Sequence, residues 1–344
     1  LLGALVEKLH AHADAHEGAA AGNGIARHAV ETRVRQRLAA TAEGTHAREH
    51  HRVGLCHLLT TRGGVRSEFT VYKLADDRFY LVGPGAFERH DWDMLNKLAP
   101  KSGVNLQLIT TQMGVLVLAG PRSRDILQKL TDTDLSNDNF KWLTGKFINV
   151  GIAQAHALRV NFVGELGWEL HHPMEMQNTI FDLVMEAGAE FGIKPFGIRA
   201  MTTMAIEKSY RLIGRELSIE YSAYESGLDR FVHPNKGQFI GRDALVERHG
   251  KGDDWTYITM EVHGIKDCDA RGSEAVYDAD GNLVGRATSG GYGWRLGKSL
   301  ALAMVKPEHA TLGNTLQIKI LGDLYKTTII EESPFDPENE RLRA

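Results

Sequence analysis

The chain has 344 residues, with 40 basic and 44 acidic side chains and a formal net charge of −4. This length exceeds what one hydrophobic core usually holds, so a single small module is excluded and two or three domains are expected. The balanced charge, without a long run of lysine or arginine, argues against nucleic acid as a partner. No stretch approaches the roughly 18 apolar residues of a membrane span, so no membrane association is expected.

The two cysteines, Cys56 and Cys268, lie far apart in the sequence. Their spacing argues against a disulfide framework and against a thiolate metal cluster. A reducing compartment fits best. We therefore expect a cytoplasmic location, or the mitochondrial matrix if the source is eukaryotic.

The first 52 residues differ in composition from the rest. Residues 1–52 contain no aromatic residue and are rich in alanine, histidine and arginine. Residues 25–40 could form a helix on propensity, but they offer few large apolar side chains. His12 and His16 share one face of any helix there, yet solvated histidines are the better interpretation than a metal site. We expect an atypical leader, loosely attached or disordered, and no metal.

The segment from Val65 onward alternates with a period of two. One face carries Val65, Ser67, Phe69 and Val71, and the other carries Arg66, Glu68, Thr70 and Tyr72. This pattern predicts a hairpin over residues 65–83 with its turn at residues 75–78. Helices are predicted at about 86–98 and 122–130, with an apolar strand at 115–119 between them. We expect an α+β domain over residues 53–150.

A second α+β domain is expected over residues 151–249, although it looks incomplete. Strands are predicted at 157–162 and 168–171, separated by a glycine-flanked turn that contains Glu165. Helices are predicted from about Pro173 to Gly192 and from about Phe196 to Tyr210.

After Gly250 the pattern changes to strands. The predicted strands are 255–262, 274–277, 283–287, 299–305, 316–321 and 325–331. Asp280-Gly281 and Gly322-Asp323 are typical hairpin turns. Residues 250–344 are therefore expected to form a small β-barrel or sandwich.

Two glutamates are the candidate chemical groups. On its strand face, Glu68 could present an acid or base beside the Thr70 hydroxyl and the Tyr72 ring, which suits a flat ligand. Glu165 lies between Gly164 and Gly167, which permit a backbone excursion that pushes its carboxylate out of a strand end. From spacing alone, a solvent-facing edge strand is the favoured explanation for Glu68, and an ordinary bulge is the alternative explanation for Glu165.

Three separated stretches resemble one known family. Residues 63–71, 163–170 and 206–211 occur in the order found in folate-dependent aminomethyltransferases of the glycine-cleavage T-protein type. The C-terminal half of dimethylglycine and sarcosine dehydrogenases is the most similar, because it also resembles this chain at residues 224–228 and 333–337. The resemblance runs from about residue 53 to the end.

The resemblance implies a fold, a cofactor and roles for named residues. In that family two ferredoxin-like α+β domains and a C-terminal β-barrel surround a cavity that holds tetrahydrofolate. Glu68 matches the carboxylate that contacts the folate amine receiving the one-carbon unit, which makes it the expected catalytic residue. Glu165 matches the glutamate that hydrogen-bonds the pterin ring. Tyr72 matches an aromatic cofactor contact, and Thr70 and Val82 are expected beside it.

Two departures from the family pattern also matter. The arginine of the family's Leu-Arg-Leu-Glu helix is Ala205 here, and Arg199 is the nearby substitute expected to contact the cofactor. The leader does not resemble the family's first strand and helix. The flavin-binding half of the dehydrogenases is absent, so FAD is expected only through a missing domain or a flavoprotein partner.

These implications lead to one preferred function and two alternatives. The preferred one is a tetrahydrofolate-dependent module that captures the iminium or formaldehyde released when a methylated amine is oxidised. The first alternative is the glycine-cleavage aminomethyltransferase, which takes its one-carbon unit from a lipoylated carrier. The second is a noncatalytic folate-binding or scaffold subunit.

Overall fold

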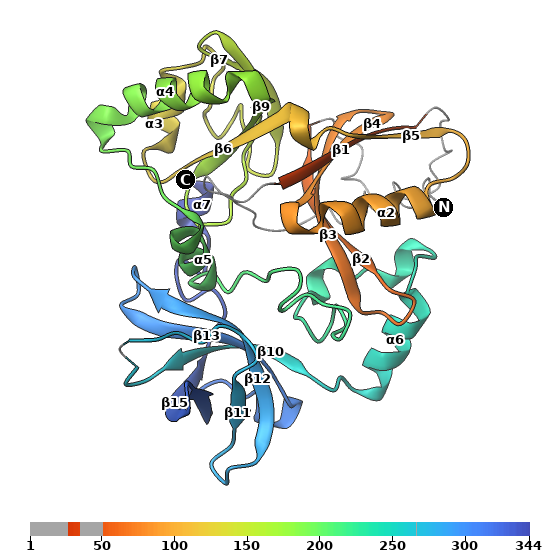
Figure 1. Ribbon diagram of the computed structural model, residues 1–344, viewed down its shortest axis with the longest axis vertical. Coiled ribbons are helices and arrows are strands. Elements are labelled where there is room, and N and C mark those ends of the chain that lie inside the picture. Colours follow the sequence, from red (N-terminus) through yellow and green to blue (C-terminus); the bar gives the residue numbers. More distant parts are fainter. Residues whose placement is uncertain (1–26, 35–50, 266) are drawn as a thin grey trace.

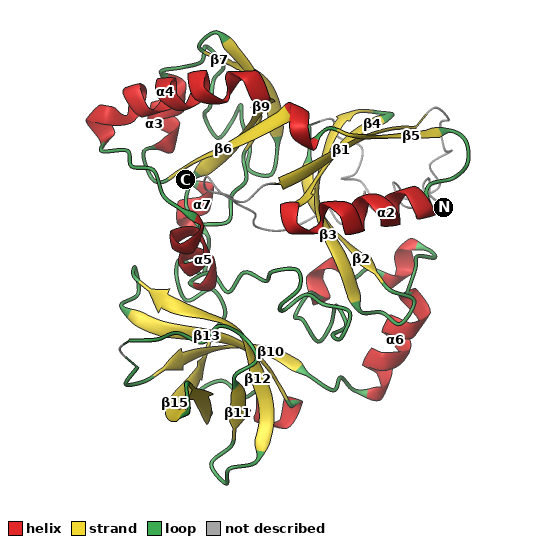
Figure 2. Cartoon of the chain, viewed as in Figure 1, coloured by secondary structure: helices red, strands yellow, loops and turns green. Residues whose placement is uncertain are grey.

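The computed structural model describes residues 27–34, 51–265 and 267–344. Two open sheets and a closed barrel form three lobes around a region that contains α5 and α7 (Figure 1). Helices accompany the two open sheets, whereas the third lobe is almost entirely strands (Figure 2). The expected α+β class with a C-terminal barrel is confirmed.

The first lobe is a five-stranded sheet in the order β2-β3-β4-β1-β5. Its strands are β1 (Arg27–Val34), β2 (Val53–Leu59), β3 (Val65–Ala75), β4 (Arg78–Pro84) and β5 (Val104–Leu108). Helix α2 (Glu88–Leu98) follows the short turn η1 (Gly85–Phe87) and covers one face, where Met94 and Leu95 pack against Phe69 and Phe79. The predicted hairpin and its turn are confirmed.

The prediction for the leader is partly wrong. Residues 27–34 form strand β1 rather than a helix, and β1 pairs antiparallel with both β4 and β5. Pairing with a strand on each side stabilises the extended conformation, which helix propensity alone does not take into account. The β-branched residues Val30, Thr32 and Val34 also favour a strand. The remaining leader predictions, including the histidines, fall outside the described residues.

The second lobe is a four-stranded sheet in the order β6-β9-β8-β7. Its strands are β6 (Met113–Ala119), β7 (Gly145–Val150), β8 (Ala153–Leu158) and β9 (Gly167–Pro173). Helices α3 (Ser123–Gln128) and α4 (Gln177–Gly188) pack on a core around fully buried Trp168. The short turns η2 (Thr110–Gln112), η3 (Met174–Met176) and η4 (Ala189–Phe191) flank these elements.

Two sequence predictions change in this lobe. The strand predicted at 157–162 ends at Leu158, and residues 159–166 form an irregular connection that carries Glu165. The domain boundary predicted after residue 150 falls inside the hairpin of β7 and β8. The four-stranded sheet therefore takes strands from both predicted segments.

A buried polar chain joins the first two lobes. The Tyr80 hydroxyl on β4 lies 3.1 Å from His171 Nδ1 on β9, and His171 Nε2 lies 3.1 Å from the Glu169 carboxylate. His171 and Glu169 are fully buried. Such a chain of hydrogen bonds fixes the relative position of the two sheets, because each buried group would otherwise lose its partner.

The third lobe is a closed barrel in the order β10-β13-β12-β11-β14-β15. Its strands are β10 (Thr256–Val262), β11 (Ala275–Tyr277), β12 (Leu283–Gly293), β13 (Lys298–Val305), β14 (Thr315–Ile320) and β15 (Asp323–Ile330), with η7 (Pro307–His309) between β13 and β14. Both predicted hairpin turns are confirmed, since β11 pairs with β12 and β14 pairs with β15. The structure thus decides between barrel and sandwich in favour of the barrel.

Short helices connect the lobes. Helix α5 (Ile198–Ile206) packs against β12 of the barrel, and it ends earlier than predicted because Ser209 adopts a φ of 55°. The turns η5 (Asp229–Phe231) and η6 (Pro234–Lys236) lead into α6 (Arg242–Lys251), which sequence reasoning missed. The chain finishes with α7 (Glu340–Arg343).

Candidate functional site

Strand β3 places Glu68 opposite a histidine on the neighbouring strand. The register of β2 and β3 pairs His57 with Glu68, so both side chains leave the same face of the sheet. His57 Nε2 lies 2.9 Å from Glu68 Oε2, and the side chains are 5% and 16% exposed, respectively. The ring edge of His57 also meets Phe231 at a centroid distance of 5.5 Å. Glu68 is therefore a half-buried carboxylate held by one defined partner.

On the opposite face of β3, Ser67 next to Glu68 binds a residue of helix α2. The Ser67 hydroxyl donates a 2.7 Å hydrogen bond to the fully buried carboxylate of Asp91 on α2. His90 Nδ1 lies 3.0 Å from the same carboxylate oxygen. This buried contact fixes β3 against its helix next to Glu68, and the sequence analysis did not predict it.

The other residues predicted on the Glu68 face are brought together and buried. Thr70 pairs with Val82 across β3 and β4, and Tyr72 packs in one apolar cluster with Val82 and Leu158. Tyr72 is only 1% exposed, and burial raises the pKa of its phenol to about 12. The role of Thr70, Tyr72 and Val82 as cofactor contacts stays a prediction.

A cavity of about 260 Å³ lies along β2. One wall is formed by residues 56–61, another by Met94 and Leu98 of α2, and a third by residues between Ala223 and Leu245. The walls are mainly apolar. His57 belongs both to this cavity and to the Glu68 pair, so the cavity adjoins the residue that holds the predicted catalytic carboxylate.

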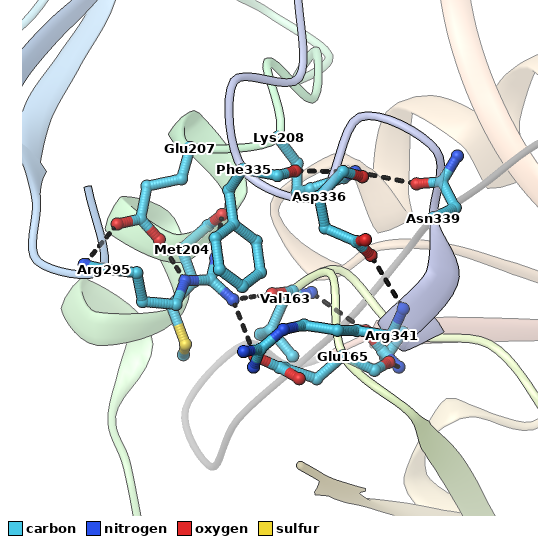
Figure 3. A network of polar contacts seen from close by, with 11 residues as sticks. Val163, Glu165, Met204, Glu207, Lys208, Arg295, Phe335, Asp336, Asn339 and Arg341 are labelled. Atoms are coloured by element: carbon cyan, nitrogen blue, oxygen red, sulfur yellow. Dashed lines mark hydrogen bonds and ion pairs between the residues drawn. The ribbon is translucent and has the colours of Figure 1, made fainter. Parts of the chain in front are cut away.

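Glu165 lies at a junction of the second lobe, the barrel and the C-terminal segment (Figure 3). Its Oε1 atom accepts contacts from Arg295 at 3.3 Å and Arg341 at 3.4 Å. Its Oε2 atom is buried and has no hydrogen-bond partner in the described part of the chain. The preceding Gly164 adopts a φ of 70°, and a Cβ there would lie 2.6 Å from the side chain of Lys208. The tight excursion predicted around Glu165 therefore requires glycine.

Arg295 is the central residue of this junction, and sequence reasoning missed it. Its side chain binds the carboxylate of Glu207, which is 1% exposed, and donates to the carbonyls of Val163 at 2.9 Å and Met204 at 3.0 Å. Its guanidinium also lies 3.6 Å from the ring centroid of Phe335. The partners of Arg295 lie about 90 and 130 residues away along the chain. Nothing in the sequence around a hairpin turn indicates such distant partners, so the role of Arg295 becomes visible only in the fold.

Arg199 does not join either group of residues. It is exposed in the first turn of α5, whereas Ala205 is buried at the end of that helix. The guanidinium that reaches the end of α5 is instead that of Arg295. Glu68 and Glu165 also have separate hydrogen-bond partners. That both carboxylates line one folate cavity therefore stays a prediction.

Among the described residues, no group of three or more histidine, cysteine, aspartate or glutamate side chains is arranged to hold a metal ion. None of the described helices is long and apolar enough to cross a membrane.

Comparison with known proteins places this architecture in one family. Residues 35–236 match the GCVT N-terminal domain, and residues 257–336 match the glycine cleavage T-protein C-terminal barrel domain. The chain belongs to the glycine cleavage T-protein family. The resemblance expected from three short stretches is thereby confirmed over both parts of the chain.

The relatives of this chain are of two kinds, dehydrogenases and aminomethyltransferases. The mouse mitochondrial dimethylglycine dehydrogenase is 37% identical over 84% of this chain, but the match covers 33% of that enzyme. The aminomethyltransferase of Thermoanaerobacter sp. (strain X514) is 33% identical over 79% of this chain and 73% of its own length. The chain therefore spans about one third of the dehydrogenases it matches.

A solved structure agrees with the fold. The glycine cleavage system aminomethyltransferase T from Bartonella henselae superposes with a TM-score of 0.79, covering 96% of this chain and 90% of that one at 20% identity. The fold is thus that of an aminomethyltransferase, and the chain is related both to dimethylglycine dehydrogenases and to aminomethyltransferases.

Proposed function

We propose that this chain is a tetrahydrofolate-dependent one-carbon transfer module of a demethylating enzyme of the dimethylglycine or sarcosine dehydrogenase type. The observation that carries the proposal is the Glu68 carboxylate, half-buried and held at 2.9 Å by His57 on the face predicted to meet folate. The identity to dimethylglycine dehydrogenase supports the choice of branch. We further propose a cytoplasmic or mitochondrial matrix location.

The donor and acceptor groups present suit a folate. A reduced pterin offers several N–H donors, and the buried Oε2 of Glu165 is an acceptor without a partner in the described residues. Glu165 would therefore hold the pterin, and Glu68 would lie near the amine that reacts. When bound, tetrahydrofolate supplies the nucleophilic amine that captures the one-carbon unit.

The residues of this chain would then do three things. The Glu68 carboxylate stabilises positive charge as it develops at the amine, and afterwards accepts the released proton on a carboxylate oxygen. His57 keeps Oε2 of Glu68 engaged, which leaves Oε1 for the reacting group. Arg295 and Arg341 hold Glu165 in place through its Oε1 atom.

Electrons for the oxidation must come from elsewhere. We propose that a flavoprotein half, either a further domain or a partner chain, oxidises the methylated amine with FAD and releases the iminium or formaldehyde to this module. The two thirds of dimethylglycine dehydrogenase outside the match leave room for such a half.

Titration calorimetry tests this proposal directly. Tetrahydrofolate should bind the purified chain, and Glu165→Gln should weaken that binding, whereas Glu186→Gln on the exposed face of α4 should leave it unchanged. Absence of binding at high ligand concentration would remove the proposed function and leave only a scaffold role.

One observation favours a second candidate within the same family. The match to the Thermoanaerobacter aminomethyltransferase covers 73% of that protein, whereas the match to mouse dimethylglycine dehydrogenase covers 33% of that enzyme. Product formed from a lipoylated carrier protein, without any flavoprotein, would support glycine-cleavage aminomethyl transfer over the demethylating role.

The contribution of His57 can be tested by paired substitutions. His57→Phe removes the hydrogen bond to Glu68 and should lower kcat by about 10- to 100-fold, because a misplaced reacting group costs rates of that order. His57→Gln retains an N–H donor and should recover a substantial part of kcat. The KM for tetrahydrofolate should change less than kcat in both variants, since Glu165 is the residue predicted to hold the pterin. Equal losses in the two variants would contradict the positioning role.

A further inference from the structure

The proposed reaction leaves the cavity along β2 without a role. Among the described residues that line it, the charged ones are Arg66 and Lys236, which are both cations. The body of the cavity is apolar, with Leu58, Met94, Leu98 and Phe239 among its walls. An apolar cavity with cationic groups at its wall is complementary to an anion that carries an apolar body.

The position of Lys236 supports this view of the cavity. Lys236 lies in η6, and its ammonium is 4.9 Å from the ring centroid of Phe239, another lining residue. Burial raises the pKa of the Cys56 thiol to about 12, the nearby Lys236 charge opposes that rise, and the Glu68 charge adds to it. Lys236 therefore lies near the inner wall of the cavity, where Cys56 is buried.

The size of the cavity limits the ligand. At about 260 Å³ it is smaller than the ~300 to 1,000 Å³ typical of sites for drug-sized molecules. A short aliphatic chain or a single aromatic ring is the body that such a volume accepts.

We propose that this cavity binds a small amphipathic carboxylate, whose apolar body fills the space between β2, α2 and residues 223–245 and whose carboxylate meets Lys236 and Arg66. Two sources share this chemistry. One is the aminobenzoylglutamate half of a folate, and the other is an amino acid with an apolar chain between its methylated amine and its carboxylate.

A ligand in the cavity would affect the Glu68 side chain through His57. His57 forms part of the cavity wall and also positions Glu68, so the bound ligand would contact the residue that positions Glu68. This coupling rests on the proposed function, whereas binding itself does not.

The structure offers a local reporter and an internal reference for the test. Met94 lines the cavity, whereas Met304 is fully buried in the barrel and lies outside the cavity walls. Protein labelled with ¹³C at the methionine methyl groups would be titrated with hexanoate, and separately with 6-(methylamino)hexanoate and 4-aminobenzoylglutamate. Hexylamine, which has the same body and the opposite charge, is the control ligand.

Carboxylates should shift the Met94 signal and leave the Met304 signal in place, and hexylamine should shift neither. Lys236→Met combined with Arg66→Met should weaken hexanoate binding about tenfold or more, whereas Lys101→Met at an exposed position should not. The tighter of the two larger ligands identifies the source. An unmoved Met94 signal, equal binding of hexylamine, or unchanged affinity in the double variant would overturn the proposal.

The failure of this proposal and that of the proposed function are distinguishable. The titration involves no turnover, so a negative result leaves the folate reaction untouched. A Glu68→Gln variant that has lost product formation should still bind hexanoate, because Glu68 is not among the lining residues.

Discussion

Replacing Glu68 by alanine or glutamine is expected to reduce folate-dependent product formation at least about a hundredfold, the usual contribution of a positioned acid or base. Glutamine keeps the size of the side chain but removes the charge that would stabilise the developing cation. The measurement is methylenetetrahydrofolate formed by this chain, tetrahydrofolate and a demethylating flavoprotein in a reconstituted assay.

The fold should survive this substitution. Glu68 is 16% exposed and its recorded partner is His57, so neither variant opens a large cavity. The far-UV circular dichroism spectrum and the urea midpoint of each variant should therefore match those of the parent chain. Unchanged turnover in a correctly folded variant would refute the catalytic assignment, and so would equal loss in the Glu186→Gln control.

Replacing Arg295 by methionine is expected to cost about 3–5 kcal/mol in the free energy of unfolding, as when one partner of a buried ion pair is removed. The substitution strands the Glu207 carboxylate, which is 1% exposed, and it also leaves the carbonyls of Val163 and Met204 without this donor. Urea unfolding followed by circular dichroism measures the effect.

Two further variants separate charge burial from lost packing. The double variant Arg295→Met with Glu207→Met removes both charges of the Arg295–Glu207 pair, so it should recover a large part of the lost stability. Arg122→Met removes an exposed ion pair with Asp125 and should change stability by less than about 1 kcal/mol. An Arg295→Met variant as stable as the Arg122→Met control would show that the junction contributes little.

Local pattern was sufficient where side chains alternate along a strand. Fully buried Val65, Ser67 and Phe69 alternate with exposed Arg66 and half-buried Glu68, and this alternation predicted the hairpin. Alternation does not show which strand lies alongside, and β2 was not predicted. The partnership of His57 with Glu68 depends on that register and could not be obtained from the sequence.

Elements and contacts that depend on distant partners were the ones missed. Strand β1 is stabilised by β4 and β5 on its two sides, which a propensity argument on residues 25–40 does not include. Arg295 reaches the end of α5 and the Glu165 loop only because the barrel packs against that helix. The glycine-flanked turn at Glu165, in contrast, was predictable because Gly164 is required locally.

The hairpin turn that carries Arg295 also carries Trp294, whose side chain is 78% exposed. A solvent-exposed indole is therefore the next residue in the chain to the arginine that holds Glu165. Because indole fluorescence responds to its surroundings, a change in Trp294 emission would report movement of the Arg295 turn without an added dye.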